Sequence, residues 1–231
     1  MYHHHFNASL HEADGRAAEM SGGEPWSSPR ITSAVTLFAD IVGYTRHCEG
    51  LDPEEAFLLL ADFYRHTGEA IARHDAAIVD HFGDEVLAVW KGKAPLAVQA
   101  FRALRCGFAM LVELERWNAW RAKSNLPMVR AGIGIHAGPV LLGRPHGDER
   151  GQASVFGDTV NIASRLERQT RRLGTDIVIS EELYRLVAEV AGDTALLDYF
   201  PATVSVALSG RARPLTVRPA VFPQWSMKES A

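Results

Sequence analysis

The chain has 231 residues, of which 47% are hydrophobic and 23% charged, the balance of one globular domain with tails. Basic residues number 24 and acidic residues 28, a net charge of −4, which argues against a dedicated nucleic-acid binder. No apolar run approaches the ~20 residues of a membrane helix, and Cys48 and Cys106 lie far apart, which predicts a reduced, cytoplasmic protein without disulfides.

The two ends differ in composition from the middle of the chain. Residues 1–30 contain one leucine and no isoleucine or valine, too little apolar surface to offset the entropy lost on ordering. We therefore expect a flexible N-terminal arm over residues 1–30, one domain over residues 31–221, and a C-terminal tail over residues 222–231.

The domain begins with an apolar, β-branched strand over residues 31–41. A helix start follows, because Asp52 can cap it, Pro53 fits its first position and Glu55 its third. The later predicted elements are strands 77–82 and 85–90 joined at Gly83-Asp84, a helix 95–122, a second hairpin of strands 129–136 and 140–144, a loop 145–152, a strand 154–156, a helix 159–172, a strand 176–180, a helix capped by Ser180, and strands 203–209 and 215–221. This order predicts an α+β fold with helices on one side of a sheet.

Two aspartates stand where predicted strands end. Asp40 closes the first strand and Asp84 lies in the tip of the next hairpin, so their carboxylates converge if those strands are neighbours. Paired carboxylates suit Mg²⁺ or Mn²⁺, and two such ions can clamp a phosphoryl displacement. The alternative for either residue alone is a turn-forming role.

A second polar group lies on the predicted helix 159–172. Asn161 and Arg165 are four residues apart and share a face of that helix. An amide beside a guanidinium could hold a sugar and a charged phosphate. A solvated basic helix face is the alternative.

Four segments, in this order, resemble class III nucleotidyl cyclases, the family of adenylate and guanylate cyclase catalytic domains. They are VTLFADIVGYT at 35–45, FGD at 82–84, GIGIHAG at 132–138 and FGDTVNIASR at 156–165. The resemblance covers about residues 31–221. It implies the class III cyclase fold, a ferredoxin-like sheet with helices packed on it, in a head-to-tail homodimer with composite active sites.

The resemblance also implies roles for individual residues toward a nucleoside triphosphate and two Mg²⁺ or Mn²⁺ ions. Asp40 and Asp84 would hold the metals, with the Ile41 carbonyl as a further ligand. Asn161 would orient the ribose and Arg165 would stabilise charge on the α-phosphate. The groups implied for the terminal phosphates are the backbone N–H groups of Val42, Gly43, Tyr44 and Thr45 and the side chain of Arg211.

Two positions read the base in this family, and here they are Asp80 and Ser154. Both depart from the purine patterns, which place Lys or Glu at the first position and Asp, Thr or Cys at the second. A carboxylate only accepts hydrogen bonds, so adenine N1 lacks the donor that Lys would supply. Guanine and uracil each present an N–H that Asp80 could accept, and the Tyr44 phenol could alter contacts to the base or ribose.

The sequence shows no attached sensor region, and in size and layout it resembles the stand-alone pyrimidine cyclases of bacterial antiphage systems. We therefore predict a cyclase for a pyrimidine triphosphate, with UTP before CTP, then GTP, then ATP. A guanylate or adenylate cyclase is the first alternative. A non-catalytic regulatory module that binds nucleoside triphosphates is the second.

Overall fold

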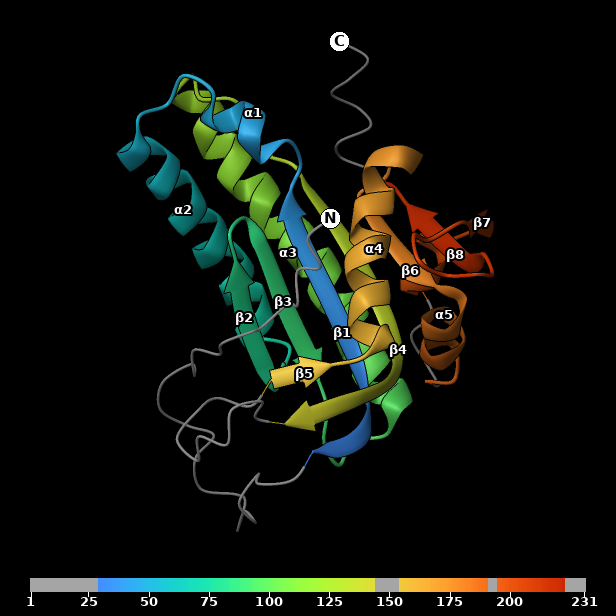
Figure 1. Ribbon diagram of the computed structural model, residues 1–231. Helices are drawn as coiled ribbons and strands as arrows, with labels where there is room; N and C mark the ends of the chain where they lie inside the picture. The colour runs from blue at the N-terminus through green and yellow to red at the C-terminus, as the bar shows by residue number, and fades with distance from the viewer. Residues whose placement is uncertain (1–28, 144–153, 191–194, 223–231) are drawn as a thin grey trace.

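The fold is built on one mixed β-sheet. The computed structural model describes residues 29–143, 154–190 and 195–222, so nearly all of the predicted arm and tail, and the loop 145–152, lie outside the described residues. Eight strands pair in the order β2-β3-β1-β4-β6-β8-β7, with β5 also paired to β4 (Figure 1). The strands are β1 (Arg30–Ile41), β2 (Ile78–Phe82), β3 (Glu85–Trp90), β4 (Ala131–Gly143), β5 (Ser154–Phe156), β6 (Ile177–Ser180), β7 (Val204–Val206) and β8 (Leu215–Ala220).

Helices cover both faces of this sheet. They are α1 (Tyr44–Cys48), α2 (Pro53–Ala72), α3 (Leu96–Lys123), α4 (Asp158–Leu173) and α5 (Glu181–Ala188), with a 3-10 helix η1 (Ala195–Tyr199). The connection β1-α2-β2-β3-α3-β4, with strand order β2-β3-β1-β4, is a ferredoxin-like unit. The predicted α+β class is therefore confirmed.

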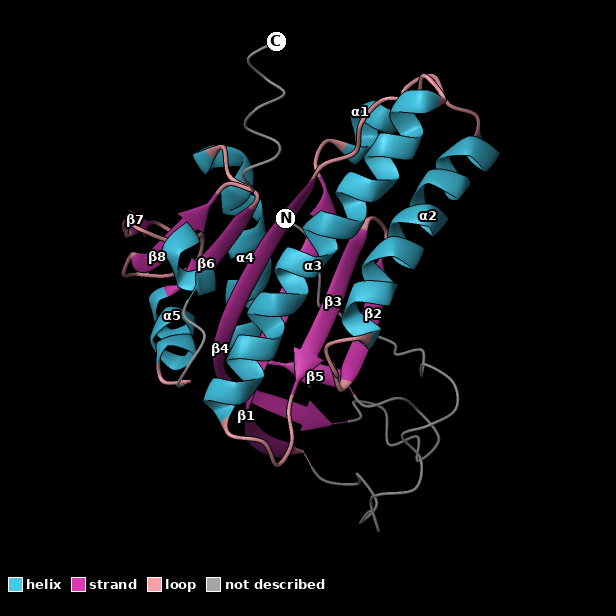
Figure 2. Cartoon of the chain, turned by 180° about the vertical axis from the view of Figure 1, so that it is seen from behind, coloured by secondary structure: helices cyan, strands magenta, loops and turns pink. Residues whose placement is uncertain are grey.

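The expectation that all helices lie on one side of the sheet is wrong for α4. Helices α2, α3 and α5 pack in one apolar cluster with one face of the sheet, whereas α4 crosses the opposite face, in front of β1 and β4 in Figure 1 and behind them in Figure 2. The reason lies in β4, whose side chains alternate between faces. Ile133 and Ile135 belong to the α3 cluster, and Gly132 and Gly134 face α4.

Gly134 sets how closely α4 approaches the sheet. A Cβ atom at Gly134 would lie 2.1 Å from the Glu167 backbone nitrogen and 2.3 Å from the Ala163 carbonyl oxygen. No side chain fits there, so the helix axis can approach β4 only because this residue is glycine. The backbone of α4, and the polar residues on it, are positioned by this contact.

The predicted hairpin within residues 129–144 is also wrong, because β4 is one continuous strand of 13 residues. It pairs with the long strand β1 from Ile41 opposite Ala131 to Arg30 opposite Leu142. Pro139 removes only one donor, and its carbonyl accepts a 2.7 Å hydrogen bond from the Thr159 hydroxyl. A twelve-residue partner strand therefore overrides the local turn signal.

Two predicted helix caps are confirmed. Asp52 and Glu55 form the capping box that starts α2, and Ser180 caps α5 by accepting from the Leu183 N–H. Both cysteines are free thiols. No helix in the described part of the chain is long and apolar enough to cross a membrane.

Candidate active site

Asp40 and Asp84 meet at one end of the sheet. Asp40 lies near the end of β1, directly opposite Glu85 of β3, and Asp84 is in the β2–β3 turn just before Glu85. Asp84 is close enough to Asp40 to raise the pKa of its carboxyl. Tyr64 of α2 donates a hydrogen bond to the Gly83 carbonyl, and so holds the turn that carries Asp84.

Burial and neighbouring acids outweigh the cation that compensates the Asp40 carboxyl. Burial raises its pKa to about 8, and the neighbouring Asp84 and the charge of Glu167 act in the same direction, while Arg171 opposes them. Its Oδ1 atom is buried without a hydrogen-bond partner. Burial also raises the pKa of Glu167 to about 7.

These features fit a divalent metal ion. Two carboxylates, one with a buried and unpartnered oxygen, are hard donors of the type that Mg²⁺ prefers. Among the described residues no three His, Cys, Asp or Glu side chains are grouped to hold a metal. Water and substrate phosphates would complete the coordination, as is usual for Mg²⁺ in phosphoryl-transfer sites. The roles of Asp40, Asp84 and the Ile41 carbonyl as ligands stay predictions.

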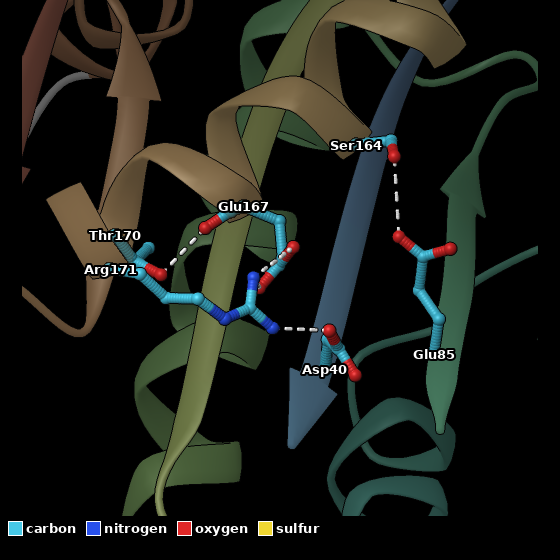
Figure 3. Close-up of polar contacts among 6 residues, drawn as sticks. All are labelled: Asp40, Glu85, Ser164, Glu167, Thr170 and Arg171. Carbon is cyan, nitrogen blue, oxygen red and sulfur yellow. Dashed lines mark hydrogen bonds and ion pairs between the residues drawn. The ribbon is translucent and has the colours of Figure 1, made fainter. Parts of the chain in front are cut away.

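Two residues of α4 that the sequence analysis did not single out complete this end of the sheet (Figure 3). Arg171 forms an ion pair with Asp40 and a second, 2.9 Å long, with Glu167. The Glu167–Arg171 spacing of four residues is a readable helical pair. The contact with Asp40 joins residues 131 positions apart, which no local pattern reveals.

One of the four backbone N–H groups predicted to bind the terminal phosphates already has a partner within the protein. The Val42 N–H donates to the Arg130 carbonyl at 2.9 Å, so this N–H is not available to bind a phosphate. Gly43 has a φ of 73°, and α1 begins after it with no side-chain cap, which leaves Gly43, Tyr44 and Thr45 as predicted donors. The Tyr44 phenol donates to the Ala56 carbonyl of α2 at 3.5 Å, and an effect of this phenol on ribose or base contacts stays a prediction.

Arg165 of α4 and Arg211 of the β7–β8 connection belong to a second polar group, near the start of α4. Gly210, in the β7–β8 connection, leaves room for Arg165, whose Nη2 would lie 3.7 Å from a Cβ at that position. Arg211 pairs with Asp158 at the start of α4, and Asn161 is exposed one turn before Arg165. At 1.5 Å per residue, Arg165 and Asn161 lie about 9 and 15 Å along the axis from Arg171, which contacts Asp40. Within one chain Arg165 lies beside the β7–β8 connection, whereas Arg171 contacts Asp40.

The comparison with known proteins now identifies the family. Residues 27–207 match the profile of the adenylate and guanylate cyclase catalytic domain. The chain belongs to this family. It is 37% identical over 144 residues to adenylate cyclase 1 of Rhizobium meliloti (strain 1021), covering 62% of this chain and 22% of that protein. It is 35% identical over 154 residues to an adenylate cyclase of Anabaena cylindrica, covering 64% and 30%.

The fold agrees with this assignment. The crystal structure of the guanylyl cyclase Cya2 matches with a TM-score of 0.71 and 27% identity, covering 83% of this chain and 92% of that one. The class III cyclase fold implied by the resemblance is thus confirmed. The chain spans less than a third of the length of the two curated relatives.

In this cyclase domain the two predicted base-reading residues lie near one apolar cluster. Ile78 of β2, Leu87 of β3 and Val155 of β5 pack together, which brings β5 across the β2–β3 hairpin. Asp80 follows Ile78 by two residues and Ser154 adjoins Val155, and each is only 4% exposed. Asp80 Oδ1 accepts the His81 N–H at 2.8 Å. Their reading of a base stays a prediction.

Proposed function

We propose that this domain converts a nucleoside triphosphate into a 3′,5′-cyclic nucleotide and pyrophosphate. The observation that supports the proposal is that one chain carries two polar groups suited to phosphoryl transfer. One half of the proposed site is the Asp40–Asp84 pair with its unpartnered buried oxygen, and the other is the exposed Asn161 with Arg165 on α4. The family assignment supports the same chemistry.

Each half has a role in an in-line displacement. Asp40 and Asp84 would hold Mg²⁺ or Mn²⁺, which when bound acidifies the ribose 3′-hydroxyl and neutralises phosphate charge. Asn161 orients the ribose so that its 3′-oxygen faces the α-phosphorus, and Arg165 stabilises the charge that develops there. The N–H groups of Gly43 to Thr45 hold the departing pyrophosphate. Catalysis is then mainly positioning and electrostatic stabilisation.

A head-to-tail homodimer would bring the halves together. Since Arg165 lies about 9 Å along α4 from the arginine that contacts Asp40, the aspartates of one protomer need the Asn161 and Arg165 of a second copy. A two-fold axis then creates two equivalent sites. Arg211 would reach the terminal phosphates once it leaves Asp158.

The base is the finer part of the proposal. The curated relatives named above are adenylate cyclases and the structural relative is a guanylyl cyclase, which supports a purine substrate. GTP is the purine that suits a carboxylate at position 80, because guanine N1–H donates to it. Adenine N1 is an acceptor that a carboxylate at position 80 cannot serve, and an unpaired buried group of this kind costs about 1–3 kcal/mol.

UTP is the second candidate, because Asp80 and Ser154 depart from both purine patterns and uracil N3–H also donates to a carboxylate. CTP follows it. A cyclic pyrimidine nucleotide would suit an antiphage signalling role.

The deciding experiment incubates the purified chain with ATP, GTP, CTP and UTP separately, with Mn²⁺ or Mg²⁺, and resolves the products by mass. Cyclic GMP or cyclic UMP as the dominant product supports the role of Asp80. Cyclic AMP would keep the cyclase proposal and contradict that role. No product from any triphosphate would favour a binding module.

A substitution tests the base-reading residues directly. The double change Asp80→Lys with Ser154→Asp supplies the donor that adenine N1 needs, so kcat/KM for ATP should rise about tenfold or more relative to GTP and UTP. The control is Asp80→Asn, which removes the charge without adding an ammonium group and should not favour ATP as strongly. An unchanged preference in the double variant would contradict the assignment.

A further inference from the structure

Arg171 lies with one end of its guanidinium on a predicted metal ligand (Figure 3). Its Nη2 contacts Asp40 Oδ2, and its Nη1 lies 2.9 Å from Glu167 Oε1. We propose that Arg171 is an internal cation that occupies the Asp40 carboxylate in the metal-free domain and competes with divalent metal ions for it. This inference rests on the metal site of the proposed function.

The two partners of Arg171 differ in how firmly they hold it. The Glu167 side chain is 1% exposed and that of Asp40 is 16% exposed. If Arg171 left Glu167, a carboxylate would remain buried without compensation, which is strongly unfavourable. The Asp40 carboxylate is more exposed, so it can exchange the Arg171 guanidinium for another cation. The Arg171–Glu167 pair is therefore the fixed anchor and the Arg171–Asp40 pair is the exchangeable contact.

Arg171 itself can make this movement. Its side chain is 34% exposed, so Nη2 can leave Asp40 and turn toward water while Nη1 stays paired with Glu167. The nearby Glu85 is held separately, by a 3.2 Å hydrogen bond from Ser164.

Charge repulsion makes the two occupants of Asp40 exclusive. A divalent ion on Asp40 would lie within a few ångströms of the guanidinium, where two positive charges repel strongly unless solvent separates them. Arg171 thus lowers the affinity of the free domain for metal. Removing its charge should strengthen metal binding, whereas a residue that merely orients Asp40 would weaken binding when removed.

The test measures Mn²⁺ binding to the full chain by electron paramagnetic resonance, without nucleotide. Arg171→Gln should lower the Kd for Mn²⁺ by about threefold or more. Arg171→Lys should fall between this variant and the wild type, because an ammonium keeps the charge but cannot span both carboxylates. The matched control is Arg172→Gln, which removes the same charge from the exposed neighbouring position and should change the Kd less than twofold.

Asp40→Asn separates this inference from the proposed function. If Asp40→Asn leaves Mn²⁺ binding unchanged, the metal site itself is wrong, and the proposed function loses its support. If Asp40→Asn abolishes binding while Arg171→Gln leaves the Kd unchanged or raises it, only the role of Arg171 is overturned.

A second pair of variants keeps the test valid if Arg171→Gln does not fold. Glu167→Gln neutralises the buried anchor, and the double variant Glu167→Gln with Arg171→Gln removes both charges together. The double variant should bind Mn²⁺ more tightly than Glu167→Gln alone. Equal or weaker binding would overturn the proposal.

Discussion

A substitution of Arg165 tests whether this part of α4 acts on the substrate separately from the Glu167–Arg171 pair at the metal site. Because Arg165 lies about 9 Å along the helix from Arg171, and beside Gly210, it should act on substrate and leave the metal site untouched. Arg165→Ala should lower kcat by about 10²–10³-fold, the usual loss when a preorganised charge-stabilising donor is removed. Arg172→Ala serves as the matched control. A loss of Mn²⁺ affinity in Arg165→Ala would contradict this separation.

His136 gives the domain a pH-dependent stability. It is 6% exposed, its Nδ1 lies 2.8 Å from the Ser180 hydroxyl oxygen, and burial lowers its pKa from 6.5 to about 4. Between these values the unfolded chain binds a proton that the folded chain does not, so this residue makes stability fall as pH falls. At 1.36 kcal/mol per unit, the loss is about 2 kcal/mol between about pH 6.5 and about pH 5.

Urea unfolding of the wild type and of His136→Asn at these two pH values measures this contribution. The variant should lose less stability on acidification, because its amide does not titrate. Asp40 and Glu167 have raised pKa values and stabilise the fold as pH falls, so only the difference between the two proteins isolates His136. Equal pH dependence in both would refute the assignment.

At the scale of elements, the contact between β4 and α4 leaves no room for a side chain at Gly134. Gly134→Ala would place a Cβ 2.1 Å from the backbone of α4, so the helix must shift and stability should fall by about 2–3 kcal/mol. Gly68, within α2, has nothing within 4 Å of a Cβ, so Gly68→Ala should instead stabilise by about 0.5–1 kcal/mol. Thermal unfolding of both variants checks this, and similar shifts of the same sign would contradict it.

The same elements explain how far the sequence alone could predict the fold. The α2 capping box and the β2–β3 turn depend on residues next to one another, and both predictions are confirmed. The hairpin predicted around Gly138 fails because β1, about a hundred residues earlier, extends β4 through the turn signal. The sequence also did not predict that α4 packs on the opposite face of the sheet. The signal for this packing is the pair of glycines in β4 that face α4, and their role is clear only once the helix is seen against them.

The site shows the same limit. Asp40 and Asp84 could be found because strand ends are local features, and Asn161 and Arg165 because they share a helical period. Arg171 could not be connected to Asp40, since 131 residues separate them and its spacing to Glu167 predicts only a surface ion pair. Likewise the Val42 N–H donates to Arg130, the residue before β4, which lies far from Val42 in the sequence.

For the whole molecule, the proposed head-to-tail dimer would make activity a property of two chains. If each site combines Asp40 and Asp84 of one protomer with Asn161 and Arg165 of the other, then Asp40→Asn and Arg165→Ala damage different halves. A heterodimer of the two variants contains one site with both defects and one site with none. Random pairing of equal amounts makes half of the dimers heterodimers, so the mixture should regain about a quarter of wild-type activity.

The matched control is a mixture of Asp40→Asn with Asp84→Asn. Both changes damage the metal-binding half, so in their heterodimer each site retains one defective half and the mixture should stay inactive. Cyclase activity after refolding each mixture together, with the dimer fraction measured by sedimentation, distinguishes the two cases. Recovery in both mixtures, or in neither, would contradict composite sites. Full activity of a monomer would do the same, because one chain would then have to bring Arg165 to its own Asp40.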